Sequence, residues 1–127
     1  MQRSRTKGTN TVGCCDQPLH LHIGRQQARE TADLLQTLGH PIRLQILDVL
    51  AHYEGQACVC HLTEALPVKQ PTISHHLRLL KAAGLVGDER RGLWSYYHLE
   101  RGRLDELRTR LDVLLAGLGT ASGSGMP

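Results

Sequence analysis

The sequence predicts a mainly α-helical domain that carries one small β-hairpin. Apolar residues recur at helical spacing in several segments, as Ile73, Leu77 and Leu80 do at i, i+4 and i+7. One later run, LVGDERRGLWSYYHL at positions 85–99, instead combines aromatic and β-branched residues around a central turn signal, Arg-Arg-Gly. Several helices followed by a single hairpin therefore define the predicted fold class.

Composition limits what this domain can be. The 127 residues are enough for one compact domain and too few for two. The formal net charge is only +3, from 15 Lys and Arg against 12 Asp and Glu, so any surface that binds nucleic acid must be local. No apolar run approaches the ~18 residues of a membrane span, and no hydrophobic segment follows the basic start. We therefore expect a cytoplasmic protein whose thiols stay reduced.

Three regions follow one another along the chain. Residues 1–23 lack a helical or strand period and are rich in Gly, Thr and basic residues, so we expect a flexible N-terminal arm. Residues 119–127, GTASGSGMP, are expected to form a disordered tail. Residues 24–118 between them are the predicted folded domain.

Two helices are predicted at the start of this domain. The first runs from Gln26 to Leu38, and the second runs from Pro41 to about His52. Proline is tolerated in the first turn of a helix, where its missing N–H has no intrahelical partner in any case. The second helix is apolar over most of its circumference, so we expect it to lie centrally in the domain. The apolar residues near one stripe of the first helix are Ala28, Ala32, Leu35 and Leu38.

The most informative stretch is QPTISHHLRLLKAAG at positions 70–84. Pro71 opens it as a short helix, and Gly84 is expected to end that helix in the left-handed conformation. The segment from Ala57 to Leu66 predicts another short helix before it, and Pro67-Val68-Lys69 makes the tight connection. Two short helices joined in this way, the second polar on its outer face, are the helix-turn-helix pattern.

The outer face of the second of these helices indicates DNA as the partner. It carries side chains that hydrogen-bond base edges and phosphates, in place of the usual Glu and Lys pairs. The hairpin that follows has a basic tip that would reach a phosphate or a minor groove, which completes a winged helix-turn-helix. The predicted DNA-binding residues are Gln70, Thr72, Ser74, His75, Arg78, Arg90 and Arg91.

The last predicted helix runs from about Arg101 to Leu118. Its leucines repeat at intervals of 3, 4, 3 and 4, a seam pattern suited to packing against another helix. The seam could serve the core of its own chain, but the inner helices can fill that core, so the pattern favours a homodimer. The predicted dimer-interface residues are Leu35, Leu104, Leu107, Leu111 and Leu114.

Three motifs resemble the ArsR/SmtB family of metal- and metalloid-responsive repressors. They are LGHPIRLQILDVL at 38–50, CVCHL at 58–62 and QPTISHHLRLLKAAGLV at 70–86, in the order and spacing of the family. The resemblance covers about residues 30 to 117. It implies a homodimer, paired through its first and last helices, that binds operator DNA until an inducer binds and releases it.

The cysteines form two close pairs, Cys14-Cys15 in the arm and Cys58 with Cys60 at the start of the helix predicted at 57–66. A free cysteine is often a small buried hydrophobe. Both pairs avoid the apolar core stripes, however, which favours a ligand role. Their spacing does not match a structural zinc site, and thiolates prefer thiophilic ions. Arsenite and antimonite take three thiolates, and cadmium and lead also take thiolate-rich sites.

Helix geometry suggests how such a site could signal. Residues i and i+2 of a regular helix lie ~200° apart, so we expect joint binding by Cys58 and Cys60 to shift the first turn of their helix. That strain would pass to the DNA-reading helix packed against it.

The resemblance bears on the source of the third ligand. Relatives that sense arsenicals through this helix often carry a third cysteine where this chain has Thr63, and His61 stands here in place of an Asp. The third thiolate is therefore expected from Cys14 or Cys15, of the same or the partner chain. As(III) or Sb(III) is the favoured inducer, Cd(II) or Pb(II) is the alternative, and no permanently bound cofactor is expected.

Two other functions use the same cysteines. A redox-sensing repressor could form disulfides from them. A thiol enzyme, such as an arsenate reductase, would need a low-pKa cysteine in an oxyanion-binding loop, and Cys14-Cys15 has no such glycine-rich loop. We therefore do not expect an enzyme. Among the histidines, His75 and His76 are interpreted as DNA contacts or helix surface, and His40 as a helix cap.

Overall fold

The computed structural model describes residues 18–53 and 57–125, with side chains placed as far as residue 119. Five helices and three short strands follow one another along this part of the chain. They are α1 (Arg25–Leu38), α2 (Pro41–His52), β1 (Ala57–Cys58), α3 (Val59–Ala65), α4 (Gln70–Ala82), β2 (Val86–Arg91), β3 (Trp94–Leu99) and α5 (Arg101–Gly125).

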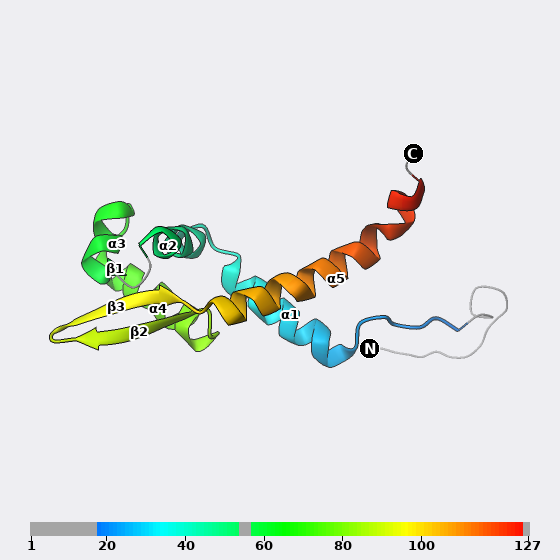
Figure 1. Ribbon diagram of the computed structural model, residues 1–127, viewed down its shortest axis with the longest axis horizontal. Helices are drawn as coiled ribbons and strands as arrows, with labels where there is room; N and C mark the ends of the chain where they lie inside the picture. The colour runs from blue at the N-terminus through cyan, green and yellow to red at the C-terminus, as the bar shows by residue number, and fades with distance from the viewer. Residues whose placement is uncertain (1–17, 54–56, 126–127) are drawn as a thin grey trace.

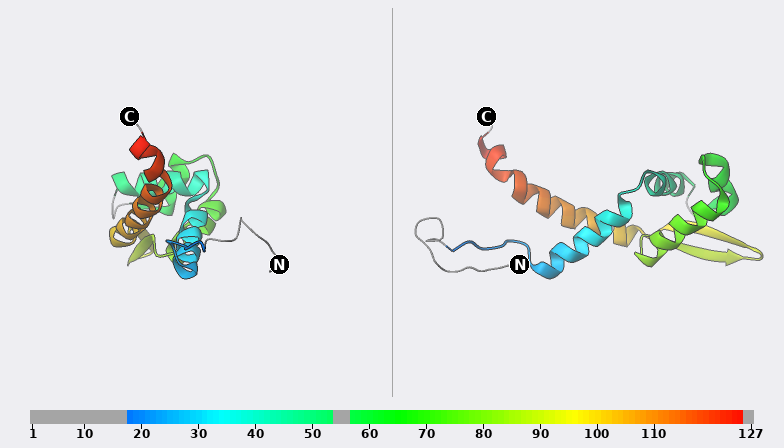
Figure 2. Two further views of the ribbon diagram at one scale, coloured as in Figure 1. Left: turned by 90° about the vertical axis from the view of Figure 1, so that its right-hand side faces the viewer. Right: turned by 180° about the vertical axis from the view of Figure 1, so that it is seen from behind.

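The molecule has two parts (Figures 1 and 2). The head, residues 41–99, gathers α2, α3, α4 and the strands around one core. The stem is made of α1 and α5, which lie side by side and extend away from the head. The hairpin of β2 and β3 projects at the opposite end (Figure 1). None of the helices in the described ranges combines the length and apolar character that a bilayer crossing requires.

Helix α2 runs through the head as predicted. Its first turn contains Pro41, and the His40 side chain caps it, because Nδ1 of His40 accepts a hydrogen bond from the Ile42 N–H at 3.1 Å. The predicted capping role of His40 is therefore confirmed. Ile46 and Leu50 are fully buried, which is the central position expected for a helix with a wide apolar arc.

Helix α4 also matches its prediction. Ile73, Leu77 and Leu80 are all buried and form its inner stripe. Gly84 has a φ of 79°, and the Leu85 N–H donates to the Leu80 carbonyl at 3.0 Å, which is a Schellman end. Lys69 stands at the N-cap without a side-chain hydrogen bond, so this helix start depends on Pro71 and on packing.

The sheet contains one strand more than the sequence predicted. The expected hairpin is present, with Arg91 opposite Trp94 and a left-handed Gly92 (φ 63°) in the tight loop between them. The prediction of helix over residues 57–66 is wrong at its start, because Ala57 and Cys58 form β1 and pair with β3. The edge of β3 carries backbone groups that need partners, and these two residues provide them. The strand order is β1-β3-β2.

The stem departs from its prediction in two ways. In α1 the inward residues are Thr31 and Leu34, whereas Ala28, Ala32 and Leu35 of the expected stripe are exposed. Helix α5 continues past the predicted end at residue 118 as far as Gly125, so the expectation of disorder from residue 119 is wrong for that stretch. Extending an established helix fixes one residue per hydrogen bond, which is far easier than nucleating a new one.

Candidate functional site

The thiol pair on the head lies at the junction of β1 and α3. Cys58 is the N-cap of α3 and has an extended backbone (φ −105°, ψ 176°), whereas Cys60 lies in the first helical turn. This change of backbone direction brings the two Sγ atoms to 2.6 Å from each other. The expectation that the helix must shift before both thiols can face one ion is therefore wrong, because Cys58 is not in helical conformation.

His61 lies beside this pair, and the sequence analysis did not identify it as a possible metal ligand. Its Nδ1 accepts a hydrogen bond from the Cys58 N–H at 3.0 Å and lies 3.3 Å from Cys58 Sγ. The ligand atoms of Cys58, Cys60 and His61 all lie within 4.8 Å of one another. Its position in the sequence could have indicated this proximity, because the side chain of the third residue of a helix often reaches back to the backbone of the N-cap residue.

The two thiols differ in acidity. Burial of Cys58 opposes its ionisation, but hydrogen bonds from the Cys60 thiol and the backbone N–H of His61 lower its pKa below the ordinary cysteine value. Cys60 is exposed, and its pKa is raised, chiefly because it hydrogen-bonds to Cys58. The pair therefore holds a thiolate most readily on Cys58, with the Cys60 S–H directed toward it.

The other residues considered as ligands are not brought to this pair. The Thr63 hydroxyl donates to the backbone carbonyls of Val59 and Cys60, at 3.1 and 2.8 Å, which are both inside α3. Cys14 and Cys15 lie outside the described residues. The part of the arm that is described, residues 18–23, lies along the stem, at the far end of the molecule from α3 (Figure 1).

The thiol junction is linked to both predicted DNA-reading elements. Cys58 pairs with Tyr96 of β3, which is the inner strand of the hairpin. Helix α3 packs on α4 through Leu62, which is fully buried, and Leu66, which is 7% exposed. A change at the start of α3 can therefore reach the hairpin through backbone hydrogen bonds and the reading helix through core contacts.

The predicted DNA-reading residues lie on two elements of the head. Gln70, Thr72, His75 and Arg78 are exposed on α4, and Ser74 is half-buried.

Arg90 and Arg91, also predicted to read DNA, are exposed at the end of β2. The Arg91 guanidinium lies over the Tyr96 ring, 4.6 Å from its centroid, and pairs with Glu89 at 3.1 Å. Arg90 donates from Nε to the Gly92 carbonyl at 3.2 Å, which directs its side chain along the hairpin loop.

His76 is not on the surface, so the interpretation of it as a DNA contact or surface residue is wrong. It is 5% exposed, and Arg43 donates from Nε to its Nδ1 at 3.1 Å. The His40 ring lies 4.4 Å from the His76 ring, centroid to centroid. Burial, then the neighbouring His40, Arg43 and His75, lowers the pKa of His76. His76 therefore ties α4 to the start of α2 as a neutral acceptor.

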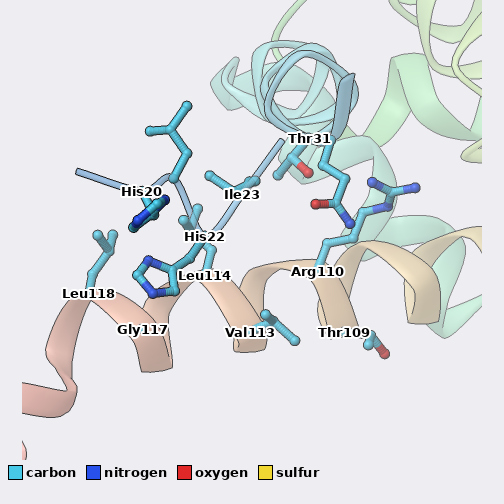
Figure 3. Close-up of a pocket in the computed structure, with 12 residues that line it drawn as sticks. His20, His22, Ile23, Thr31, Thr109, Arg110, Val113, Leu114, Gly117 and Leu118 are labelled. Atoms are coloured by element: carbon cyan, nitrogen blue, oxygen red, sulfur yellow. The ribbon is translucent and has the colours of Figure 1, made fainter. Parts of the chain in front are cut away.

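A groove of about 790 Å³ runs along the stem, between residues 20–23, α1 and the outer half of α5 (Figure 3). His20 and His22 lie above α5 in this view, near Leu114 and Gly117. Arg110 closes one side, where it pairs with Glu30 at 3.2 Å. The walls are largely apolar, and Leu118 at the open end is 72% exposed.

The predicted dimer-interface residues divide between this groove and the core. Leu107 is 3% exposed and belongs to the core of its own chain, with Leu104 and Leu111 packed against that core. The expectation that the four inner helices fill the core without α5 is therefore wrong, and Leu107 is a core residue. Leu114 lines the groove, and Leu35 on α1 is 39% exposed.

The sequence and the fold are both similar to those of known transcriptional regulators. A model of the arsR family of bacterial regulatory proteins matches residues 40–87, which hold α2, α3 and α4. An uncharacterized HTH-type transcriptional regulator of Methanocaldococcus jannaschii is 38% identical over 89 residues, covering 70% of this chain and 99% of the relative. The arsenical resistance operon repressor of Staphylococcus xylosus is 36% identical over 86 residues, covering 68% and 81%.

A solved structure agrees with these relatives. The ArsR-like transcriptional regulator from Rhodococcus sp. RHA1 superposes with a TM-score of 0.63 at 26% identity, over 78% of this chain and 92% of that one. The chain therefore belongs to the ArsR family: it is a winged helix-turn-helix transcriptional repressor that binds DNA, and it is not an enzyme.

Proposed function

We propose that this protein is an arsenite- and antimonite-responsive repressor. It binds operator DNA as a homodimer and leaves the DNA when Cys58 and Cys60, with a cysteine of an arm, bind the trivalent ion. The observation that carries the proposal is the pair of thiol sulfurs 2.6 Å apart at the junction of β1 and α3. The similar Staphylococcus xylosus protein is itself a repressor of an arsenical resistance operon.

The third thiolate is assigned to Cys14 or Cys15 of the partner chain. Thr63 has no thiol, and within the described ranges no third cysteine lies near the pair. The described arm residues lead away from α3, so an arm of the same chain would have to double back along α1 (Figure 1). An arm from the partner avoids that path, and the cost of closing the loop that brings it there is small beside three metalloid–thiolate bonds.

Mixed dimers separate the two sources of the third thiolate. One chain carries Cys58→Ser and Cys60→Ser, and the other carries Cys14→Ser and Cys15→Ser. An arm from the partner leaves one complete three-sulfur site in this heterodimer, so arsenite binds tightly to half of the sites. An arm from the same chain leaves no complete site, and tight binding is lost.

Ligation changes the DNA-reading surface through two links. A trivalent ion between Cys58 and Cys60 separates their sulfurs, which moves the end of β1 against β3 and the first turn of α3 against α4. Tyr96 connects the thiol junction to the hairpin tip, because it pairs with Cys58 and its ring lies under the Arg91 guanidinium. A ligand at the junction thus biases the two elements proposed to hold DNA, as an allosteric account requires.

The homodimer is proposed to form through the stem. The apolar side chains left exposed there lie on the outer half of α5, where Val113 is 70%, Leu115 59% and Leu118 72% exposed. Leu35 of α1 and Leu114 in the groove extend this surface. Apolar surface of this kind on two adjacent helices is typical of an interface. A two-fold pair of heads would place two reading helices in successive major grooves.

One titration series tests the inducer. The wild-type protein on fluorescently labelled operator DNA is titrated with arsenite, cadmium, zinc and peroxide, and release is followed by anisotropy. Release at the lowest concentration by arsenite, reversed by a competing dithiol, supports the proposal. Release by cadmium at a far lower concentration than by arsenite would be consistent with the proposed thiol site but would make cadmium the inducer. Release by peroxide alone, reversed by a monothiol reductant, would make the protein a redox sensor.

The second candidate is a repressor that senses cadmium or lead with the same cysteines. The specific observation in its favour is the Cys58–Cys60 pair itself, since both ions take thiolate-rich sites and an arm cysteine would complete either set. The titration above separates the two, because the operator responds to whichever ion the complete site binds more tightly.

A further inference from the structure

The tip of the hairpin exposes two large apolar side chains that are adjacent in the sequence. Leu93 is 86% exposed and Trp94 is 57% exposed. Neither belongs to the core or to the partly buried side chains packed against it. Turn residues are usually small or polar, because an apolar side chain at a turn stays in contact with water. A leucine and a tryptophan at the end of an element that projects from the head (Figure 1) therefore indicate a partner that covers them.

The same tip carries positive charge. Arg91 lies directly opposite Trp94 in the hairpin, so their side chains share one face. The Arg91 guanidinium lies over the ring of Tyr96, 4.6 Å from its centroid. Nε of Arg90 donates to the Gly92 carbonyl at 3.2 Å, which holds the second guanidinium at the loop. An apolar tip framed by two arginines is complementary to a DNA minor groove, which has phosphates along its rims and sugars and stacked bases inside.

We propose that Leu93 is an apolar wedge that enters the minor groove next to the major groove read by α4 and partly unstacks one base step, while Trp94 covers the sugars beside it. The proposal rests on the operator binding of the proposed function and is independent of the inducer. Leucine is among the side chains that proteins insert between base steps in this way. The left-handed Gly92 (φ 63°) lets the chain turn sharply between the two strands, so Leu93 stands at the extremity of the hairpin.

Such a wedge reads the deformability of the DNA instead of its hydrogen-bonding groups. Unstacking a base step has an energetic cost, which is offset when Leu93 and Trp94 leave water. The cost is lowest at flexible pyrimidine–purine steps, such as TA, and higher in stiff A-tracts. Arginines without a wedge have the opposite preference, because the narrow minor groove of an A-tract has a strongly negative potential. The preferred flanking sequence therefore distinguishes a wedge from a purely electrostatic contact.

The test uses an operator duplex selected from a random-sequence pool by binding to the wild-type protein. Two versions keep the half-sites and carry either a TA step or an A-tract in the base pairs next to each half-site. The wild type should bind the TA version ~10-fold more tightly, the effect of one unfavourable base pair. Leu93→Ser should lose this preference and keep the salt slope, because it removes no charge. Leu19→Ser alters a leucine that is 95% exposed in the arm and should behave as the wild type does.

Fluorescence reports the contact itself, because Trp94 is the single tryptophan of the chain. Its emission should shift to shorter wavelength when the TA duplex is added, since the indole leaves water. The base analogue 2-aminopurine, placed at the TA step, should brighten on binding of the wild type as the step unstacks. The same duplex should brighten much less with Leu93→Ser.

Equal affinity of the wild type for the two duplexes, or an unshifted Trp94 emission in the complex with DNA, would overturn the proposal. An emission shift that follows protein concentration without DNA would also overturn it, because a second copy of the chain would then cover the tip. The outcome is separable from that of the proposed function. A protein that prefers the TA duplex but keeps its DNA in arsenite would retain the wedge and reject the arsenite response, whereas arsenite release without a step preference would do the reverse.

Discussion

The head and the stem differ in how completely they bury their apolar residues. In the head, α2, α3, α4 and the hairpin enclose a shared core, and Ile46, Leu62, Ile73 and Leu80 are fully buried. In the stem, only the inner half of α5 reaches that core, and the outer half leaves Leu118 largely exposed. The core of the head is thus closed by Leu34 of α1 and Leu107 of α5, whereas the outer half of α5 leaves uncovered the apolar surface that we propose pairs two chains. A single helix therefore carries both core residues and residues proposed for assembly.

The largest expected effect comes from comparing two leucines of α5. Leu107→Ala should lower the free energy of unfolding by ~2–5 kcal/mol, because it opens a cavity in the core. Leu118→Ala removes the same atoms from an exposed position and should change the free energy of unfolding by less than ~1 kcal/mol at low protein concentration. Urea unfolding of both variants measures this difference. Equal losses of unfolding free energy in the two variants would contradict the assignment of Leu107 to the core and of Leu118 to the surface.

The next effect concerns assembly. Val113→Glu combined with Leu118→Glu should weaken the proposed homodimer at least ~10-fold, since it places unpaired charges in an apolar interface. Circular dichroism of the variant should keep the helical signal, because neither residue belongs to the core. Arg108→Glu, also exposed on α5, is the matched charge control. Light scattering that finds an unchanged dimer in the double variant would exclude the outer half of α5 from the interface.

DNA binding should respond to the hairpin tip by a smaller amount. Arg90→Ala with Arg91→Ala should weaken binding to all sequences and lower the magnitude of the salt slope by about 2, one for each phosphate that no longer meets an arginine. Ser74→Ala or His75→Ala should instead make DNA binding less sequence-specific, with a loss of ~1–3 kcal/mol in binding free energy for the preferred operator. Anisotropy at several salt concentrations distinguishes the two behaviours. Unchanged affinity and slope in the arginine double variant would remove the hairpin from the interface.

The smallest effect is a pH dependence of stability. Because the folded-state pKa of His76 lies below its ordinary value of ~6.5, the unfolded chain binds this proton more readily. Its contribution to stability is therefore present above pH ~6.5 and is lost as the pH falls below it. His76→Asn keeps an acceptor for Arg43 and should flatten this dependence, whereas His52→Asn at an exposed position should not. Urea unfolding at several pH values is the check.

Much of the head could be predicted from local sequence patterns. The buried stripe of α4, its end at Gly84 and the hairpin around Gly92 all follow from periodicity and turn chemistry within a few residues. The strand at Cys58 could not be predicted in this way. It exists because β3, almost forty residues later in the chain, offers an edge to pair with. The proximity of Cys58, Cys60 and His61 depends on that strand.

The remaining errors also come from tertiary neighbours. His76 shares the polar sequence of α4 with His75, but only His76 faces Arg43 and His40 and is buried. The even leucine repeat of α5 does not reveal that Leu107 packs in its own chain while Leu118 does not. In both cases the local pattern places a residue on a face, and only the fold decides what covers that face.

The central claim is that a ligand on the head thiols lowers DNA affinity, and operator binding with and without arsenite tests it most directly. Saturating arsenite should weaken wild-type binding at least ~10-fold, within the range of typical allosteric coupling. Cys58→Ser should bind the operator as well as the wild type without arsenite, because its hydroxyl keeps a small polar side chain at the N-cap. It should bind equally well with arsenite. Release of the Cys58→Ser variant at the wild-type arsenite concentration would contradict the account.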